Sequence, residues 1–164
     1  MNDFEFSLAF TLKEEGALDE EGKITPSAGY TNDPNDAGGE TKFGISKRAY
    51  PNIDIKSLTY DKVKEIYKKD YWDKAGCDSI PFPYNVCVFD CAVNQGVGRA
   101  SQFLIKAKDW NQFITLRAEH YLNLNNKSEE LYERGWINRL LRLQKYIYTK
   151  QICELKAAIQ NRVS

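Results

Sequence analysis

A chain of 164 residues is long enough to bury one hydrophobic core and too short to divide into two ordinary domains. Hydrophobic residues make up 42% of the chain and charged residues 28%, a composition that excludes disordered and fibrous classes. Lys plus Arg and Asp plus Glu number 23 each, so no net charge favours nucleic acid or an anionic membrane as a partner. We therefore expect a single domain over residues 1–164 that binds no nucleic acid.

The N-terminal segment predicts an amphipathic helix rather than a signal peptide or a membrane span. Its apolar residues are interrupted by charged ones, and no basic leader precedes them. Asn2 or Asp3 can cap this helix, and Gly16 can end it. Glu15 then lies at the end of the apolar face. We expect no membrane insertion.

Apolar residues at helical spacing dominate the remaining chain, and strand-like alternation is nearly absent. Segment 17–41 is rich in Gly, Asp, Asn and Pro, which predicts a long ordered loop with a short hairpin around Ile24 and Tyr30. The further predicted helices are a short one over 43–50, one from Thr59 to Gly76 with Tyr67 and Tyr71 inward, a buried central one over 84–93 that Gly96 and Gly98 break, and two over 111–124 and 136–159. The predicted fold class is mainly α, with a long loop or small hairpin after the first helix.

The four cysteines are interpreted as reduced and mostly buried, because a chain of this length needs no disulfide framework. Cys87 and Cys91 lie four residues apart and could offer three metal ligands together with His120. Their spacing is not that of a zinc ribbon. We therefore expect no metal and no other cofactor.

Glu15 has the position that an acid catalyst needs. Such a carboxylic acid must keep its proton near neutral pH, which requires partial removal from water. Apolar side chains of the first helix can desolvate Glu15 and raise its pKa. Glu14 points about 100° away on a helix and is the poorer candidate.

The loop TNDPNDAGGET offers a second carboxylate in Asp33 or Asp36. Gly39 and the glycine before it allow the backbone to approach a ligand closely. Thr41 can hold a water molecule or donate to a carboxylate. On pattern alone, a DPND turn followed by a glycine hinge explains the same residues.

The order of these residues resembles the signature EGGYxNDPxDxGGxTxxGI of glycoside hydrolase family 108. The matching positions are Glu15, Gly16, Gly29, Tyr30, Asn32, Asp33, Pro34, Asp36, Gly38, Gly39, Thr41, Gly44 and Ile45. The likeness continues in Asp70, Tyr71, Trp72, Val88, Phe89, Asp90, Ala92, Val93, Asn94, Gly96, Arg117, Gly135, Trp136 and Arg139. Members of the family are N-acetylmuramidases and phage endolysins, so the resemblance implies a lysozyme-like helical fold and cleavage of bacterial peptidoglycan between N-acetylmuramic acid and N-acetylglucosamine.

The resemblance implies that Glu15 is the catalytic acid. It assigns catalytic roles to Asp36 and Thr41, by their likeness to the Glu, Asp and Thr arrangement of phage lysozymes. Asp33 remains a rival for the second carboxylate.

Substrate contacts are expected at Tyr30, Asp33, Gly39 and Asn94. Asn94 follows Asp90 by one helical turn, and this pair can either order the loop from behind or touch the sugar.

The chain departs from the family pattern in two places. Ala17–Ala28 is inserted between Gly16 and Gly29, so the loop must fold back for Glu15 and Asp36 to meet. After Leu104 the family's DGxxGxxT stretch is missing, which removes the basis for an auxiliary wall contact there.

Two other functions remain open at this point. A lytic transglycosylase also uses one glutamate but ends in a 1,6-anhydro sugar, and a wall-binding or virion protein would keep the fold without activity. For an enzyme of this family, we expect synthesis in a host bacterial cytoplasm and release to the cell wall by a separate holin. Carriage in a virion is an alternative.

Overall fold

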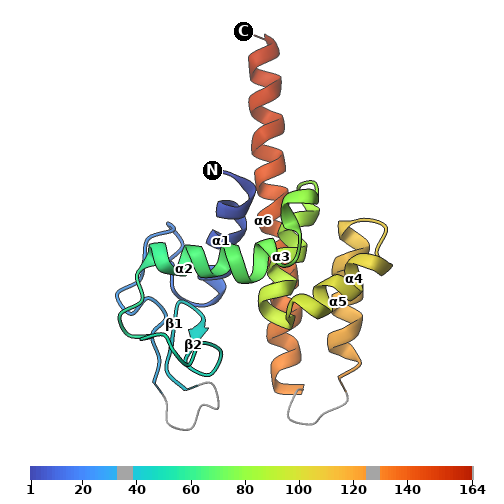
Figure 1. The fold of residues 1–164 in the computed structure, drawn as a ribbon. Coiled ribbons are helices and arrows are strands. Elements are labelled where there is room, and N and C mark those ends of the chain that lie inside the picture. Colours follow the sequence, from blue (N-terminus) through green and yellow to red (C-terminus); the bar gives the residue numbers. More distant parts are fainter. Residues whose placement is uncertain (33–38, 125–129, 164) are drawn as a thin grey trace. The chain divides into compact units, whose positions relative to one another are not determined.

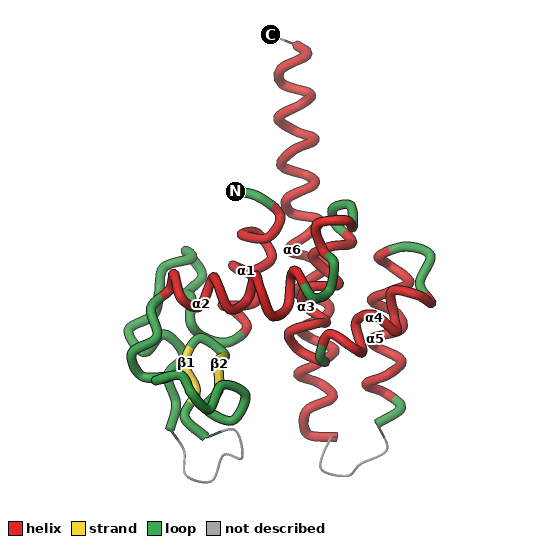
Figure 2. The backbone as a smooth tube through the Cα atoms, viewed as in Figure 1, coloured by secondary structure: helices red, strands yellow, loops and turns green. Residues whose placement is uncertain are grey.

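The computed structural model describes residues 1–32, 39–124 and 130–163, and these form helices with one small antiparallel sheet (Figures 1 and 2). The elements are α1 (Asp3–Glu14), β1 (Thr41–Lys42), β2 (Ile45–Ser46), α2 (Tyr60–Tyr67), the π-helix η1 (Lys68–Asp73), the 3₁₀-helix η2 (Cys77–Ser79), α3 (Tyr84–Gln95), α4 (Val97–Lys106), α5 (Trp110–Leu122) and α6 (Glu130–Val163). The mainly α fold class is confirmed. The chain forms two compact units, 1–101 and 102–164, and the single domain stays a prediction.

Helix α1 begins at a complete capping box. The Asn2 side chain accepts from the backbone N–H of Glu5 at 2.8 Å, and the Glu5 side chain accepts from the backbone N–H of Asn2. This arrangement satisfies backbone donors that the first turn otherwise leaves unpaired. The helix ends where Gly16 takes a φ of +69°, as the sequence predicts.

The inserted segment Ala17–Ala28 folds back on itself. Leu18 pairs with Ile24 in an antiparallel bridge, and the backbone N–H of Thr25 donates to the Ala17 carbonyl at 3.0 Å. At the tip, the Asp19 carboxylate accepts from two backbone N–H groups. The predicted hairpin therefore exists around Ile24 but does not extend to Tyr30.

The predicted helix over 43–50 is wrong. Residues 41–46 form the β1–β2 hairpin, in which Lys42 pairs with Ile45 across a turn made by Phe43 and Gly44. Both turn residues have positive φ, +53° and +75°, as a tight hairpin turn requires. Helical spacing of apolar residues carries no information on this backbone conformation.

Thr59 caps α2 as predicted, and its hydroxyl accepts from the backbone N–H of Lys62. The helix then passes directly into the π-helix η1. The turn at Gly76, with a φ of +68°, follows.

The core of the first unit lies between α1, α3 and η1, which pack on one another. The rings of Phe4, Trp72 and Phe89 meet there with centroids 5.4–5.9 Å apart. Cys77, Cys87 and Cys91 are buried free thiols, whereas Cys153 on α6 is exposed. The prediction that the cysteines are mostly buried is confirmed.

In the second unit α5 packs against α6, with Trp110 and Tyr148 rings 5.3 Å apart. Sequence reasoning missed α4. Gly96 ends α3 as predicted, with a φ of +89°, but Gly98 lies inside α4 and breaks nothing.

None of the helices in the described part of the chain has the length and hydropathy of a transmembrane segment. Among the same residues, no group of three His, Cys, Asp or Glu side chains is placed to hold a metal ion.

Candidate active site

Glu15 is the residue at which α1 ends. Its backbone N–H donates to the Thr11 carbonyl at 3.0 Å, which fixes the residue to the last helical turn. Its side chain is half-buried. The left-handed Gly16 then turns the chain away from the helix, so the carboxyl group is presented at the helix end.

Two glycines allow the loop backbone to pack directly on Glu15. A Cβ atom at Gly44 would lie 2.8 Å from Glu15 Cγ and 3.2 Å from Glu15 Cδ. A Cβ atom at Gly29 would lie 2.6 Å from the Glu15 carbonyl oxygen. Both glycines have positive φ, so neither space nor backbone conformation suits another residue. The segment before residues 33–38 and the segment after them therefore both pack on this glutamate.

The residue before each of these glycines also has an unusual backbone conformation. Ala28 and Phe43 have φ values of +51° and +53°, and the backbone N–H of Phe43 donates to the Ala28 carbonyl at 2.9 Å. Left-handed non-glycine residues cost free energy and gather at functional sites. Their pairing beside Glu15 marks this part of the structure as the candidate active site.

Tyr67, the last residue of α2, completes the surroundings of Glu15. Its side chain is 1% exposed, and its hydroxyl donates to the Phe43 carbonyl at 2.9 Å. The same hydroxyl lies 2.6 Å from the Cβ position of Gly44, on which the Glu15 side chain also packs. Sequence reasoning interpreted Tyr67 as a core residue, because helical spacing reports an apolar face and not the use of a hydroxyl.

Hydrogen bonds connect residues 30–31 to residues 39–41. Thr31 and Thr41 pair in an antiparallel bridge, with two backbone hydrogen bonds of 2.9 Å. The Thr41 hydroxyl donates to the Gly39 carbonyl at 3.2 Å. Tyr30 donates to Glu40 at 2.9 Å, and this hydrogen bond raises the pKa of Tyr30. Sequence reasoning did not single out Glu40.

Asp33 and Asp36, the two candidates for the second carboxylate, lie outside the described residues. Asn94 is half-buried in the last turn of α3, and Asp90, one turn earlier, is 1% exposed. Helix α3 packs on α1, the helix that ends at Glu15. The structure thus brings Glu15, Gly29, Gly44 and Tyr67 together. Tyr30 and Thr41 lie in the adjoining loop.

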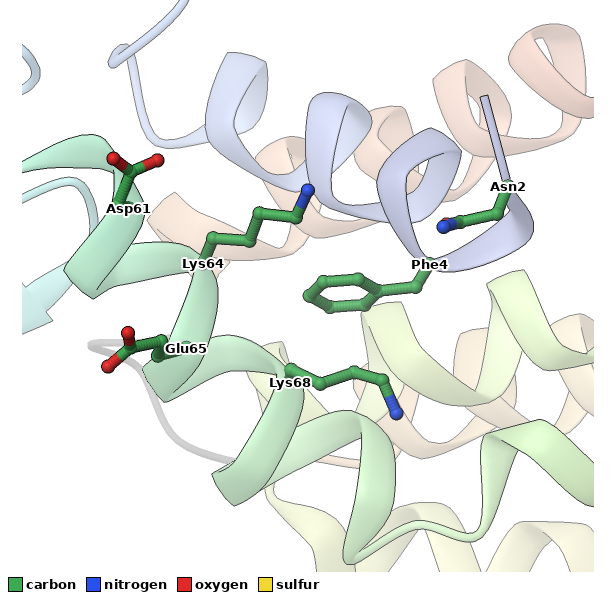
Figure 3. A pocket seen from close by; sticks show the side chains of 6 residues that line it. All are labelled: Asn2, Phe4, Asp61, Lys64, Glu65 and Lys68. Atoms are coloured by element: carbon green, nitrogen blue, oxygen red, sulfur yellow. The ribbon is translucent and has the colours of Figure 1, made fainter.

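A hollow of about 460 Å³ lies near the opposite end of α1 from Glu15 (Figure 3). The Phe4 ring lies there beside Lys64 and Lys68, whose ammonium groups pair with carboxylates elsewhere: Lys64 with Glu5 at 2.6 Å, and Lys68 with Asp78 at 3.1 Å. Its position at the start of α1 separates it from the candidate active site.

The solved structure of Brucella abortus SagA is similar to this chain. The TM-score is 0.68, the identity is 22%, and the similarity covers 89% of this chain and 94% of that one. A search of curated proteins found no match. The similarity supports the lysozyme-like fold.

The model of the family described as glycosyl hydrolase 108 matches residues 8–96, which is more than half of the chain. The match begins within α1 and ends at the close of α3, and so includes Glu15 and the loop packed on it. The resemblance drawn from the sequence is confirmed: the chain belongs to the glycosyl hydrolase 108 family and is a glycoside hydrolase.

Proposed function

We propose that this protein is an N-acetylmuramidase that hydrolyses the bond between N-acetylmuramic acid and N-acetylglucosamine in bacterial peptidoglycan. Family membership supports a peptidoglycan hydrolase. The observation that carries the proposal is the packing of the Gly44 backbone on the half-buried Glu15 side chain, because this close contact orients the carboxyl group.

In this mechanism Glu15 donates its proton to the departing glycosidic oxygen as the bond breaks. A second carboxylate stabilises the positive charge at the anomeric carbon or orients the attacking water. We propose Asp36 for this role, with Asp33 as the rival, and Thr41 as a residue that holds the water. Tyr30, Gly39 and Asn94 are proposed to contact the sugar.

Replacement of Glu15 by Gln tests the acid. The variant keeps the shape of the side chain and removes the transferable proton. We expect hydrolysis of purified peptidoglycan to fall at least about a hundredfold, with the unfolding temperature unchanged. Glu14→Gln is the matched control, because Glu14 is the adjacent half-buried glutamate of α1. Near-normal turnover by a folded Glu15→Gln protein would exclude Glu15 as the acid.

Mass spectrometry of the digestion products identifies the reaction. A muramidase leaves reducing N-acetylmuramic acid ends. Products with 1,6-anhydro ends would instead identify a lytic transglycosylase. Absence of cleavage with retained wall binding would identify a non-catalytic protein.

Asp36→Ala and Asp33→Ala distinguish the two candidates for the second carboxylate. If Asp36 acts on the reacting sugar, its loss lowers cleavage far more than thermal stability. Asp33→Ala has the reverse effect if Asp33 only pins the turn. Full activity of Asp36→Ala would transfer the role to Asp33 or to Thr41 and its water.

The resemblance to phage endolysins further supports action at the host cell wall after release from the cytoplasm through a separate holin. A virion-borne enzyme is the alternative. Detection of the protein in purified virions would favour the latter.

A further inference from the structure

A second hollow, of about 290 Å³, lies on the surface of the first unit. It is lined by Ala49, Tyr50, Asp70, Tyr71 and Lys74. Its volume is close to the lower end, about 300 Å³, of the range for small-molecule sites. The hollow is therefore of a size that suits a single sugar ring.

Polar groups in this hollow converge on one carboxylate. Asp70 accepts from the Tyr50 hydroxyl at 3.1 Å and from the Lys74 ammonium at 2.8 Å. The Lys74 hydrogen bond holds the pKa of Asp70 below its usual value, so the group is ionised at neutral pH. A carboxylate has about four acceptor positions and an ammonium three donors, so the pair retains capacity for the hydroxyl and amide groups of a sugar.

The exposure of this pair fits ligand contact. The Asp70 side chain is 24% exposed and that of Lys74 60%. Burial raises the pKa of Tyr50, which keeps its hydroxyl protonated as a donor to Asp70. Tyr71 adds a half-buried aromatic ring, the kind of surface on which the apolar face of a sugar packs.

The helix that supplies these residues is irregular at this point. Asp70 and Tyr71 lie in the π-helix Lys68–Asp73, which follows α2 without a break. Short π-helical segments are rare and occur frequently at functional sites, because they shift side chains relative to the regular helical faces. Here Trp72 stays buried in the core while its two predecessors line the hollow.

The hollow is connected to Glu15 through Tyr67 and Gly44. The rings of Tyr71 and Tyr67 have centroids 5.5 Å apart. The Tyr67 hydroxyl and the Glu15 side chain both lie within 3.2 Å of the Cβ position of Gly44. A glycan strand bound at Glu15 extends beyond the cleaved bond, and only the buried Tyr67 separates the ring of Tyr71 in the hollow from the packing around Glu15.

We propose that the hollow formed by Tyr50, Asp70, Tyr71 and Lys74 is a saccharide-binding subsite for a sugar of the glycan strand away from the cleaved bond. This inference rests on the proposed function. Asp70 accepts from sugar hydroxyl or amide groups, Lys74 donates to sugar oxygens, and Tyr71 packs on the ring. The subsite contributes to substrate binding and not to the chemical step.

The test measures binding of soluble, uncross-linked peptidoglycan glycan strands to the Glu15→Gln protein by calorimetry. Asp70→Asn and Lys74→Ala are introduced into this background. Asn keeps an acceptor for Tyr50, and Lys74 is mostly exposed, so neither change is expected to unfold the protein. We expect each to raise the Kd at least fivefold. Lys62→Ala is the matched control, because Lys62 pairs with Glu65 on α2 outside the hollow.

In the active enzyme, Asp70→Asn and Lys74→Ala are expected to raise KM at least fivefold while kcat changes less than twofold. Unchanged Kd and KM in both variants, or a loss of stability alone, would reduce the pair to a surface ion pair and overturn the subsite. An equal effect of Lys62→Ala, or no glycan binding by the Glu15→Gln protein, would also overturn it. These outcomes are separate from the failure of the proposed function, which appears as the absence of cleavage by the unaltered enzyme.

Discussion

Gly44→Ala tests whether the contact between the loop and Glu15 supports catalysis. The new methyl group would lie 2.8 Å from Glu15 Cγ and 2.6 Å from the Tyr67 hydroxyl. Tyr67 is buried and held by its hydrogen bond to the Phe43 carbonyl, so it yields less easily than Glu15. The Glu15 side chain is therefore displaced, while the 2.6 Å contact with Tyr67 remains as strain in the fold.

The size of the effect follows from these distances. An ordinary carbon–carbon contact is about 3.5 Å, so Glu15 Cγ must shift by roughly 0.7 Å. Misplacement by about 1 Å costs up to about a hundredfold in rate, so we expect kcat to fall about 10- to 100-fold. The left-handed backbone of residue 44 costs about 1–2 kcal/mol and overpacking about 1–3 kcal/mol.

Peptidoglycan turnover and urea unfolding measure the two effects. Gly76→Ala is the matched control, because Gly76 has a φ of +68° and a Cβ atom there meets nothing within 4 Å. It should show the backbone cost alone, with full activity. Tyr67→Phe in the Gly44→Ala background removes the 2.6 Å contact and should recover part of the stability. If Gly44→Ala matched Gly76→Ala in both stability and turnover, the reasoning would be refuted.

Three further predictions concern the ends of the first helix. Asn2→Ala removes the capping box and should lower the unfolding free energy by about 1 kcal/mol in urea denaturation, whereas no change would mean that the cap contributes nothing. The hydrogen bond from Lys64 holds the pKa of Glu5 below its ordinary 4.5, so this pair stabilises the fold above pH 4.5 and stops doing so as the pH falls through the lowered pKa. Glu5→Gln should therefore lose less stability on acidification than the unaltered protein, and equal acid sensitivity would contradict the assignment. Deletion of 17–27 keeps Ala28 and its contact with Phe43. It should lower the unfolding temperature but retain at least about a tenth of the activity on peptidoglycan, because the ends of this segment meet beside Glu15. Complete loss of activity in a folded variant would show that the segment itself takes part.

The helices that the sequence predicts best are those with clear caps and a sustained apolar face. Asn2 and Thr59 begin α1 and α2, and Gly16 and Gly96 end α1 and α3. Each signal is local, since a capping side chain bonds to backbone only two or three residues away. The position of Glu15 at the end of an apolar face follows from helical spacing in the same local way.

The surroundings of Glu15 could not be predicted in this way. The Phe43–Gly44 turn depends on two positive φ angles, and its apolar residues instead predicted a helix. Tyr67 reaches Phe43 across 24 residues of sequence, a contact that exists only after α2 has packed on the hairpin. The π-helix at Lys68–Asp73 could not be predicted from the sequence either, since the spacing of apolar residues does not distinguish it from the end of an α-helix.

The insertion Ala17–Ala28 reconciles the stretched sequence with the compact site. Its backbone closes through the hydrogen bond from Thr25 to the Ala17 carbonyl, and the Thr25 hydroxyl donates to the Gly16 carbonyl at 3.0 Å. On its far side, the Cβ position of Gly29 lies 2.6 Å from the Glu15 carbonyl oxygen. The two glycines that are contiguous in the family signature are thus separated in sequence while Gly29 still packs on the end of α1. Because the inserted segment closes on itself between Ala17 and Thr25, it lengthens the chain between Gly16 and Gly29 without separating Gly29 from Glu15.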